Sequence, residues 1–191
     1  MKVVAFNGSA RKQGNTGIMI EHVFAELRRA GIETEAVELA GEAIRGCAAC
    51  VKCSNTQDRR CSQTGDIVNA CIEKMLAADG VILAAPTYFA DVPAEIKALI
   101  DRAGMVARVN GDLLRRKVGA AIVVARRGGA IHAFDTLNHF FFISQMVVPG
   151  SDYWNMGYGL ERGDVRKDDE ALETMRHLGE NMAWLLGKLA R

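Results

Sequence analysis

The sequence lacks a long apolar stretch, a net charge and a recognisable leader, and each absence removes a class of function. No apolar run approaches the roughly 20 residues needed to span a bilayer, so we expect no membrane segment. Lys and Arg number 24 against 23 Asp and Glu, a formal net charge of +1. That balance offers no field to attract nucleic acid or an anionic membrane. Because no charged start precedes an apolar core, no secretory signal is visible, and we expect a cytoplasmic protein.

Two common nucleotide-binding patterns are also missing. The chain has no G-x-G-x-x-G dinucleotide motif, and Asn15 follows Gly14 where a P-loop would need its lysine. The four histidines share no metal-ligand spacing. Other residues must therefore supply the chemistry.

Cysteine is concentrated in one short segment. Cys47, Cys50, Cys53 and Cys61 have the spacing C-x2-C-x2-C-x7-C. Thiolates at such short gaps can ligate a compact iron–sulfur cluster from several directions. Free or redox-active thiols, a zinc site and disulfides are the alternatives, but zinc ligands more often come as two separated pairs, and a reducing cytoplasm disfavours disulfides. The fifth cysteine, Cys71, falls on the apolar face of a predicted helix and is expected in the core.

The rest of the chain alternates strand and helix patterns. Apolar runs such as residues 80–85 and 118–125 are typical of strands buried on both faces, and hence of a parallel sheet. We predict an α/β fold, a doubly wound five-stranded parallel sheet with helices on both faces. Residues 1–191 would form a single domain, with a Cys-rich insertion at about 46–64. The predicted strands are residues 3–6, 33–39, 80–85, 118–125 and 146–149, and the predicted helices are residues 16–30, 66–76, 93–103, 131–145 and 167–189.

The loop after the first predicted strand suits a phosphate group. In doubly wound folds ligands bind beyond the carboxyl ends of the strands, so the loops after the first, third and fourth strands should converge. Residues 8–16 lead into a helix N-terminus, where free backbone N–H groups favour an anion. We expect Ser9, Arg11, Asn15 and Thr16 to contact a phosphate there. An ordinary capped turn, which uses the same residue types, is the alternative.

The loops after the third and fourth strands suit a planar ring. Two aromatic side chains in residues 86–93 could flank the ring, and a threonine hydroxyl could reach its polar edge. Glycines in residues 126–130 let backbone amides approach the ligand and stabilise negative charge on it. The residues expected to frame the ring are Pro86, Thr87, Tyr88, Phe89, Arg126, Gly128 and Gly129.

The motifs GSARKQGNT and PTYF together resemble the flavodoxin-like NADPH-dependent FMN reductase family, and the added cysteines resemble its iron–sulfur flavoprotein branch. The resemblance implies FMN, one [4Fe-4S] cluster on the four cysteines, and assembly as a homodimer or homotetramer. Cluster-free relatives match only Cys47, Cys50 and Cys61, which makes Cys53 the discriminating residue. Charged residues fill the gap before Cys61, so we expect that ligand on a flexible loop.

These observations predict an FMN-dependent oxidoreductase in which the flavin exchanges electrons with the cluster. NAD(P)H is a candidate substrate, and the partner would be a redox protein or a small-molecule acceptor. No catalytic side chain is assigned, because the cofactors carry the chemistry. Two alternatives stay open: a cluster-free NAD(P)H-dependent reductase of FMN or quinones, and a zinc- or thiol-based interaction module without redox turnover.

Overall fold

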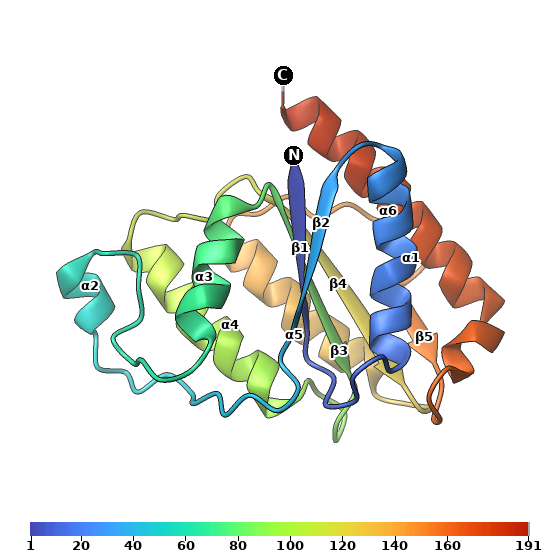
Figure 1. The fold of residues 1–191 in the computed structure, drawn as a ribbon, viewed down its shortest axis with the longest axis horizontal. Helices are drawn as coiled ribbons and strands as arrows, with labels where there is room; N and C mark the ends of the chain where they lie inside the picture. Colours follow the sequence, from blue (N-terminus) through green and yellow to red (C-terminus); the bar gives the residue numbers. More distant parts are fainter. Residues whose placement is uncertain (191) are drawn as a thin grey trace.

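Five parallel strands form the centre of the structure (Figure 1). The computed structural model describes residues 1–190. Along the sheet the strand order is β2-β1-β3-β4-β5, which confirms the predicted doubly wound parallel sheet. The strands are β1 (Lys2–Asn7), β2 (Glu33–Glu38), β3 (Gly80–Pro86), β4 (Val118–Ala125) and β5 (Met156–Tyr158).

Helices cover both faces of the sheet. None of those in residues 1–190 has both the length and the apolar character needed to cross a membrane. The α-helices are α1 (Asn15–Arg29), α2 (Lys52–Thr56), α3 (Val68–Ala77), α4 (Ala94–Val109), α5 (Ala130–Ile143) and α6 (Asp169–Leu189), and a 3-10 helix, η1, spans Asp164–Lys167.

Alternation along the strands divides the core into two layers. Val81 and Leu83 of β3 pack with buried residues of α3, α4 and α5, whereas Ile82 and Ala84 pack with those of α1 and α6. Figure 1 shows the same division, with α1 and α6 on one side of the sheet and the other long helices opposite. Because both faces are covered, the central strands β3 and β4 are almost entirely apolar, whereas the edge strand β2 is mostly polar.

The last strand lies further along the chain than the sequence predicts. Residues 146–149 were expected to form it, but only Val147 bridges to Val118, as an isolated pair. The apolar Met146 is buried in the core, with 7% of its surface exposed, but it does not pair in the sheet. Met156–Tyr158 pairs with the end of β4 instead. Apolar character alone therefore predicted the wrong strand.

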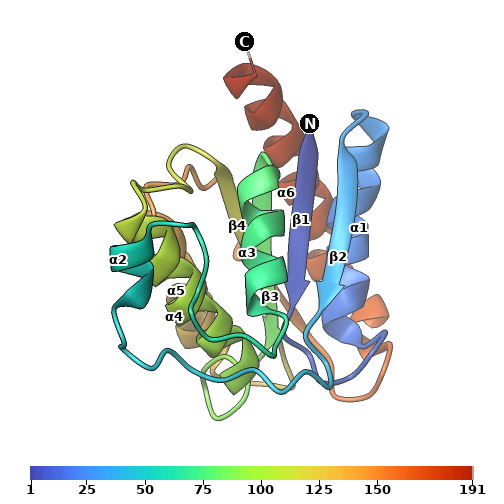
Figure 2. The same ribbon diagram turned by 60° about the vertical axis from the view of Figure 1, so that its left-hand side comes forward.

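The loops after β1, β3 and β4 leave the same edge of the sheet, at the bottom of Figure 1. The Gly8 amide donates to the Ala84 carbonyl at 2.8 Å, and the Thr87 amide donates to the Val124 carbonyl at 2.8 Å. The loops after β1 and β3 are thus each tied to the end of the neighbouring strand. Figure 2 shows the segment after β2 running along this edge towards α2, away from the sheet.

Candidate functional site

At the carboxyl edge the first loop packs on α4, the helix that follows the PTYF loop, and the second and third loops contact each other closely. A Cβ atom on Gly8 would lie 3.0 Å from Cβ of Ile96, in the first turns of α4. A Cβ atom on Gly129 would lie 2.9 Å from Cα of Ala90 and 3.3 Å from Cγ2 of Thr87. The structure therefore brings the GSARKQGNT loop, the PTYF loop and the glycine loop together, as the sequence predicts.

The first loop presents an open helix N-terminus. Ser9 and Thr16 are buried, with 5% and 1% of their surfaces exposed. The Ser9 hydroxyl accepts a hydrogen bond from the Arg11 amide at 3.2 Å, which closes the turn. Within the described residues no side chain caps the start of α1, at Gly14. Its first amides and the positive end of the helix dipole are thus suited to a phosphate.

Arg11 and Asn15 bind residues 160–163, a segment that the sequence analysis did not connect with this site. Arg11 Nη1 donates to the Leu160 carbonyl at 2.7 Å. Asn15 Nδ2 donates to the Glu161 carbonyl at 2.9 Å, and its Oδ1 accepts from the Gly163 amide at 2.7 Å. Both side chains hold residues 160–163 beside the phosphate loop, so their predicted contact with a phosphate stays a prediction.

The second loop combines a tight turn with an unpaired hydroxyl. The Tyr88 and Asp91 backbones bond to each other at 2.7 and 3.0 Å, and the Phe89 side chain at the tip is fully exposed. Asp91 Oδ1 accepts from Thr136 Oγ1 at 2.8 Å, which ties the turn to α5. The Thr87 hydroxyl is buried and has no hydrogen-bond partner in residues 1–190. A buried polar group without a partner is costly, and a ligand atom at this edge would satisfy it.

The third loop approaches the second through its backbone. Gly129 adopts a φ of +85°, a left-handed conformation that favours glycine, and precedes the first residue of α5. Arg126, Arg127 and Gly128 are exposed beside it. This loop can offer amides and cationic side chains to the same ligand.

The four clustered cysteines line one cavity of about 330 Å³. Cys47 and Cys50 are exposed, Cys53 is buried, Cys61 is half-buried, and all are free thiols. Met105 and Val106 of α4 complete the apolar wall. No three His, Cys, Asp or Glu side chains of the described chain converge tightly enough to hold a single metal ion. The thiols therefore share a cavity without meeting at one point.

The environments of the thiols differ. A hydrogen bond with Ser62 Oγ, at 3.2 Å, lowers the pKa of Cys50 below its ordinary value. Burial, together with the nearby Cys61, raises the pKa of Cys53. Burial raises the pKa of Cys71 to about 12, which confirms its expected place in the core. Cys71 is thus an unreactive thiol, distinct from the other four.

Polar side chains of α3 and α4 and a residue just after α4 hold the cysteine segment. Asn69 Oδ1 accepts from the Cys61 amide at 2.7 Å, and Asn69 Nδ2 donates to the Cys61 carbonyl at 2.9 Å. Asn110, which follows α4, donates to the Cys53 carbonyl at 3.3 Å. Arg102 Nε donates to Cys61 Sγ at 3.3 Å. Cys61 was expected on a flexible loop, but these contacts fix both its backbone and its sulfur.

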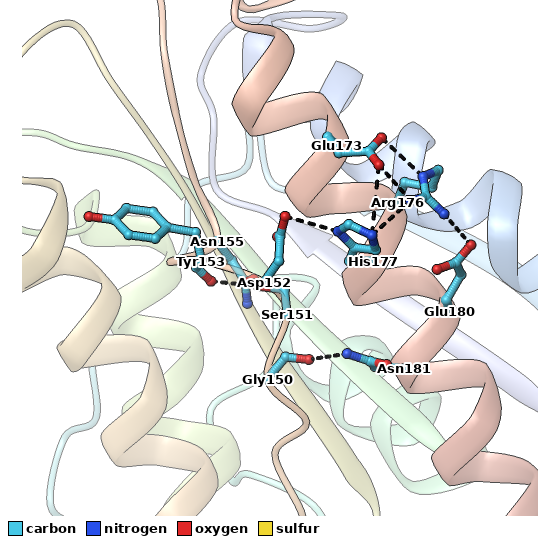
Figure 3. Close-up of polar contacts among 10 residues, drawn as sticks. All are labelled: Gly150, Ser151, Asp152, Tyr153, Asn155, Glu173, Arg176, His177, Glu180 and Asn181. Atoms are coloured by element: carbon cyan, nitrogen blue, oxygen red, sulfur yellow. Dashed lines mark hydrogen bonds and ion pairs between the residues drawn. The ribbon is translucent and has the colours of Figure 1, made fainter.

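A network on α6 anchors the loop that precedes β5 (Figure 3). Asp152 Oδ2 lies 2.9 Å from His177 Nδ1, and Arg176 Nη2 donates to His177 Nε2 at 2.7 Å. Asn181 Nδ2 donates to the Gly150 carbonyl at 2.8 Å. These contacts hold residues 150–155 between α5 and α6.

Two cavities flank this anchored loop. The larger, of about 600 Å³, lies between α5 and residues 148–155. The smaller, of about 290 Å³, reaches Gly129 of the third loop. Tyr153 and Trp154 line both. Aromatic walls of this kind suit a planar or apolar ligand.

A model of the NADPH-dependent FMN reductase family matches residues 1–161. The chain belongs to that family. It is 37% identical to an iron–sulfur flavoprotein of Methanocaldococcus jannaschii over 190 residues, covering 96% of each chain. It is 32% identical to an iron–sulfur flavoprotein of Methanosarcina thermophila over 188 residues, 97% of this chain and 95% of the relative. These matches confirm the resemblance that the sequence motifs indicated.

A solved structure confirms the flavodoxin-like fold of this FMN reductase family member. The flavodoxin, WrbA-like protein from Agrobacterium tumefaciens superposes with a TM-score of 0.63 at 18% identity, covering 98% of this chain and 97% of that one. Fold and family together make the chain an FMN-dependent oxidoreductase, which favours an enzyme over the interaction module.

Proposed function

We propose that FMN binds at the carboxyl edge of the sheet and exchanges electrons with a [4Fe-4S] cluster held by Cys47, Cys50, Cys53 and Cys61. The observation that carries the proposal is the lining of one cavity by four free thiols in a member of an FMN reductase family. Flavin accepts electrons in pairs or singly, whereas a cluster passes one at a time, so the pair would connect hydride donors to one-electron carriers.

The residues at the carboxyl edge fit FMN. The uncapped start of α1, with Ser9 and Thr16 buried beside it, would bind the phosphate. The unpaired Thr87 hydroxyl would bond to a polar edge of the ring. Contacts from the aromatic side chains and the glycine loop complete the proposed set. Its members are Ser9, Arg11, Asn15, Thr16, Pro86, Thr87, Tyr88, Phe89, Arg126, Gly128 and Gly129.

The cysteine cavity fits a polynuclear cluster better than a single ion. Zinc needs four ligands within about 2.3 Å of one point. The thiols surround a cavity without converging in threes, which suits a larger core that meets each sulfur at its own corner. The name iron–sulfur flavoprotein, carried by both archaeal relatives, supports this assignment.

Helix α4 connects the two proposed sites. Ile96, the third residue of α4, packs on Gly8 of the phosphate loop. Further along the same helix, Asp101, Arg102 and Met105 line the cysteine cavity. Arg102 lies six residues after Ile96, a rise of about 9 Å along the helix axis. Helix α4 would therefore join the residues that hold FMN to those that hold the cluster over a short span.

A cluster-free NAD(P)H-dependent reductase is the second candidate. The observation that favours it is that the close contacts of Gly8 and Gly129 at the flavin edge are made by Ile96, Ala90 and Thr87, and by no residue of the segment 46–63. In that case Cys53→Ser would leave the rate of NAD(P)H oxidation unchanged. In a cluster enzyme the same change would abolish transfer to one-electron acceptors.

Rapid mixing under nitrogen tests the proposal. Protein reconstituted with FMN, iron and sulfide is mixed with NADPH or NADH, while the flavin and cluster absorbance bands are followed separately. We expect the flavin band to bleach first and the cluster band to follow. A cluster band that stays oxidised after the flavin is fully reduced would contradict electron exchange between them.

Self-association and domain organisation complete the proposal. Phe142 and Ile143 of α5 are each 62% exposed, and Phe89 at the flavin edge is fully exposed. We propose that the whole chain acts as one flavin domain with a Cys-rich insertion, that it pairs as a homodimer or homotetramer, and that it serves a redox protein or small-molecule acceptor. Light scattering of the FMN-loaded protein measures the oligomeric state, and a monomer would contradict this part.

A further inference from the structure

Arg102 is a buried cation in the middle of α4. Its side chain is fully buried, and the Asp66 carboxylate that pairs with it is only 7% exposed. A buried charge is costly unless its partners satisfy it. Burial alone would raise the pKa of Asp66, but the hydrogen bond and charge of Arg102 lower it below its ordinary value. Both groups therefore stay charged.

The remaining donors of Arg102 reach both ends of the cysteine segment. Arg102 Nη1 donates to the Arg45 carbonyl at 3.1 Å, just before the first cysteines. Arg102 Nη2 donates to the Gln63 carbonyl at 2.9 Å, just after Cys61. Gln63 Nε2 in turn donates to the Gly46 carbonyl at 3.0 Å. One guanidinium thus ties the entry and the exit of residues 46–63 to α4.

The Nε–H group of Arg102 is directed at a proposed cluster ligand, Cys61 Sγ, at 3.3 Å. Hydrogen bonds to ligand sulfur and nearby positive charge are among the factors that set the potential of a cluster. A one-electron reduction of the cluster, with reduced flavin as the electron donor, would add one negative charge to the cluster and its thiolates. The fixed guanidinium beside Cys61 Sγ would stabilise that added charge.

We propose that Arg102 is a positioning residue for the iron–sulfur cluster: it holds the cysteine segment in its ligating shape and raises the reduction potential through Cys61. The inference rests on the proposed cluster. It goes beyond it by assigning both ligand placement and potential to a side chain that is not itself a ligand.

Arg102→Lys is the test variant, and Arg108→Lys, an exposed position on the same helix, is the matched control. Lysine keeps the charge beside Asp66, but it lacks the planar fork that reaches four partners. Hydrogen exchange is measured across residues 60–69 in the wild type and both variants, each without cluster or flavin. We expect exchange to be at least tenfold faster in Arg102→Lys, because one ammonium group cannot replace the hydrogen bonds that the guanidinium makes to Arg45, Cys61 and Gln63. The control should match the wild type.

The second measurement is the midpoint potential of the reconstituted cluster, by anaerobic titration followed by electron paramagnetic resonance. We expect Arg102→Lys to shift it roughly 59 mV more negative, the equivalent of a tenfold change in a one-electron equilibrium. An unchanged potential, or exchange equal to that of the control, would overturn the inference. If the wild type forms no cluster, the proposed function fails, and the exchange measurement still decides whether Arg102 holds the segment.

A further variant covers the case in which Arg102→Lys does not fold. The double change Asp66→Asn/Arg102→Gln removes both buried charges, so no unpaired charge remains. It should also loosen residues 60–69 and lower the potential. A potential equal to the wild-type value in this variant would contradict the role of the guanidinium.

Discussion

The flavin edge and the cysteine segment are built in different ways. At the flavin edge each loop begins where a parallel strand ends, so strand order alone brings the loops together. Residues 46–63 contain only the short helix α2, and four non-glycine residues there have left-handed φ values. Such conformations cost about 1–3 kcal/mol each and persist where the surroundings impose them. The four are Ala49, Val51, Gln57 and Arg59.

Because the two sites are built differently, a substitution that disrupts one should leave cofactor binding at the other intact. The flavin edge depends on close backbone contacts between loops, whereas the cysteine segment depends on three side chains, those of Asn69, Arg102 and Asn110. Damage to one construction should spare the cofactor bound by the other.

Loss of a ligand should give the largest effect. Cys53→Ser should reduce bound iron from about four atoms per chain to almost none, because three thiolates cannot complete the Cys₄ set. FMN content should stay the same. Iron and flavin analysis of anaerobically reconstituted protein measures both. Cys71→Ser, in the core, is the control and should keep its iron; iron retained by Cys53→Ser would exclude it as a ligand.

A glycine pair separates the flavin edge from the cluster. Gly129→Ala places a Cβ 2.9 Å from Ala90 Cα at a φ of +85°, so we expect FMN to bind at least tenfold more weakly, from about 1–3 kcal/mol of strain. Gly187→Ala, in α6, meets no atom within 4 Å and should bind FMN normally. Fluorescence titration gives both affinities. Equal affinities would show that the contact between the loops does not shape the flavin site. Loss of iron from Gly129→Ala would contradict the independence of the flavin edge from the cysteine segment.

The unpaired hydroxyl should produce opposite changes in affinity and stability. Thr87→Val removes a donor to FMN, which we expect to weaken binding about fivefold, from about 1 kcal/mol for a neutral hydrogen bond. The flavin-free protein should melt at the same or a higher temperature, because the lost hydroxyl had no partner. Calorimetry of both forms tests this. A lower melting temperature without flavin would mean that the hydroxyl stabilises the fold itself.

Thiol reactivity should show the smallest change, one that leaves cofactor content untouched. With a pKa of about 12, Cys71 is a thiolate in only about 1 of 10⁴ molecules at pH 8. Iodoacetamide at that pH should label exposed Cys50 of the cluster-free protein and leave Cys71 unmodified, as mass mapping would show. Labelling of both at similar rates would contradict the buried position of Cys71.

The fold and the meeting of the loops could be predicted because both follow local patterns. Apolar runs at residues 80–85 and 118–125 identify buried parallel strands, and topology then places their loops at one edge. The last strand could not be found in this way. Residues 146–149 are apolar because Met146 enters the core, whereas Met156–Tyr158 pairs without a strong apolar pattern.

The side-chain contacts that hold the two sites in place could not be predicted from the sequence, because they join residues that no local pattern connects. Asn15 meets the loop at Glu161, and Asn69 meets Cys61, through contacts that no local pattern encodes. Arg102 did leave a signal: it lies between Leu99 and Val106 on the apolar face of α4, where a charged residue requires a buried partner. A charge at a core position of a helix next to a cysteine cluster is therefore a useful sign of a supporting residue.

Native mass spectrometry of protein purified under nitrogen tests the central claim most directly, because it weighs each chain with whatever it holds. The account predicts a mass increase equal to one FMN plus four irons and four sulfides per chain. A chain that carries FMN with a zinc ion, or FMN with no further mass, would contradict it.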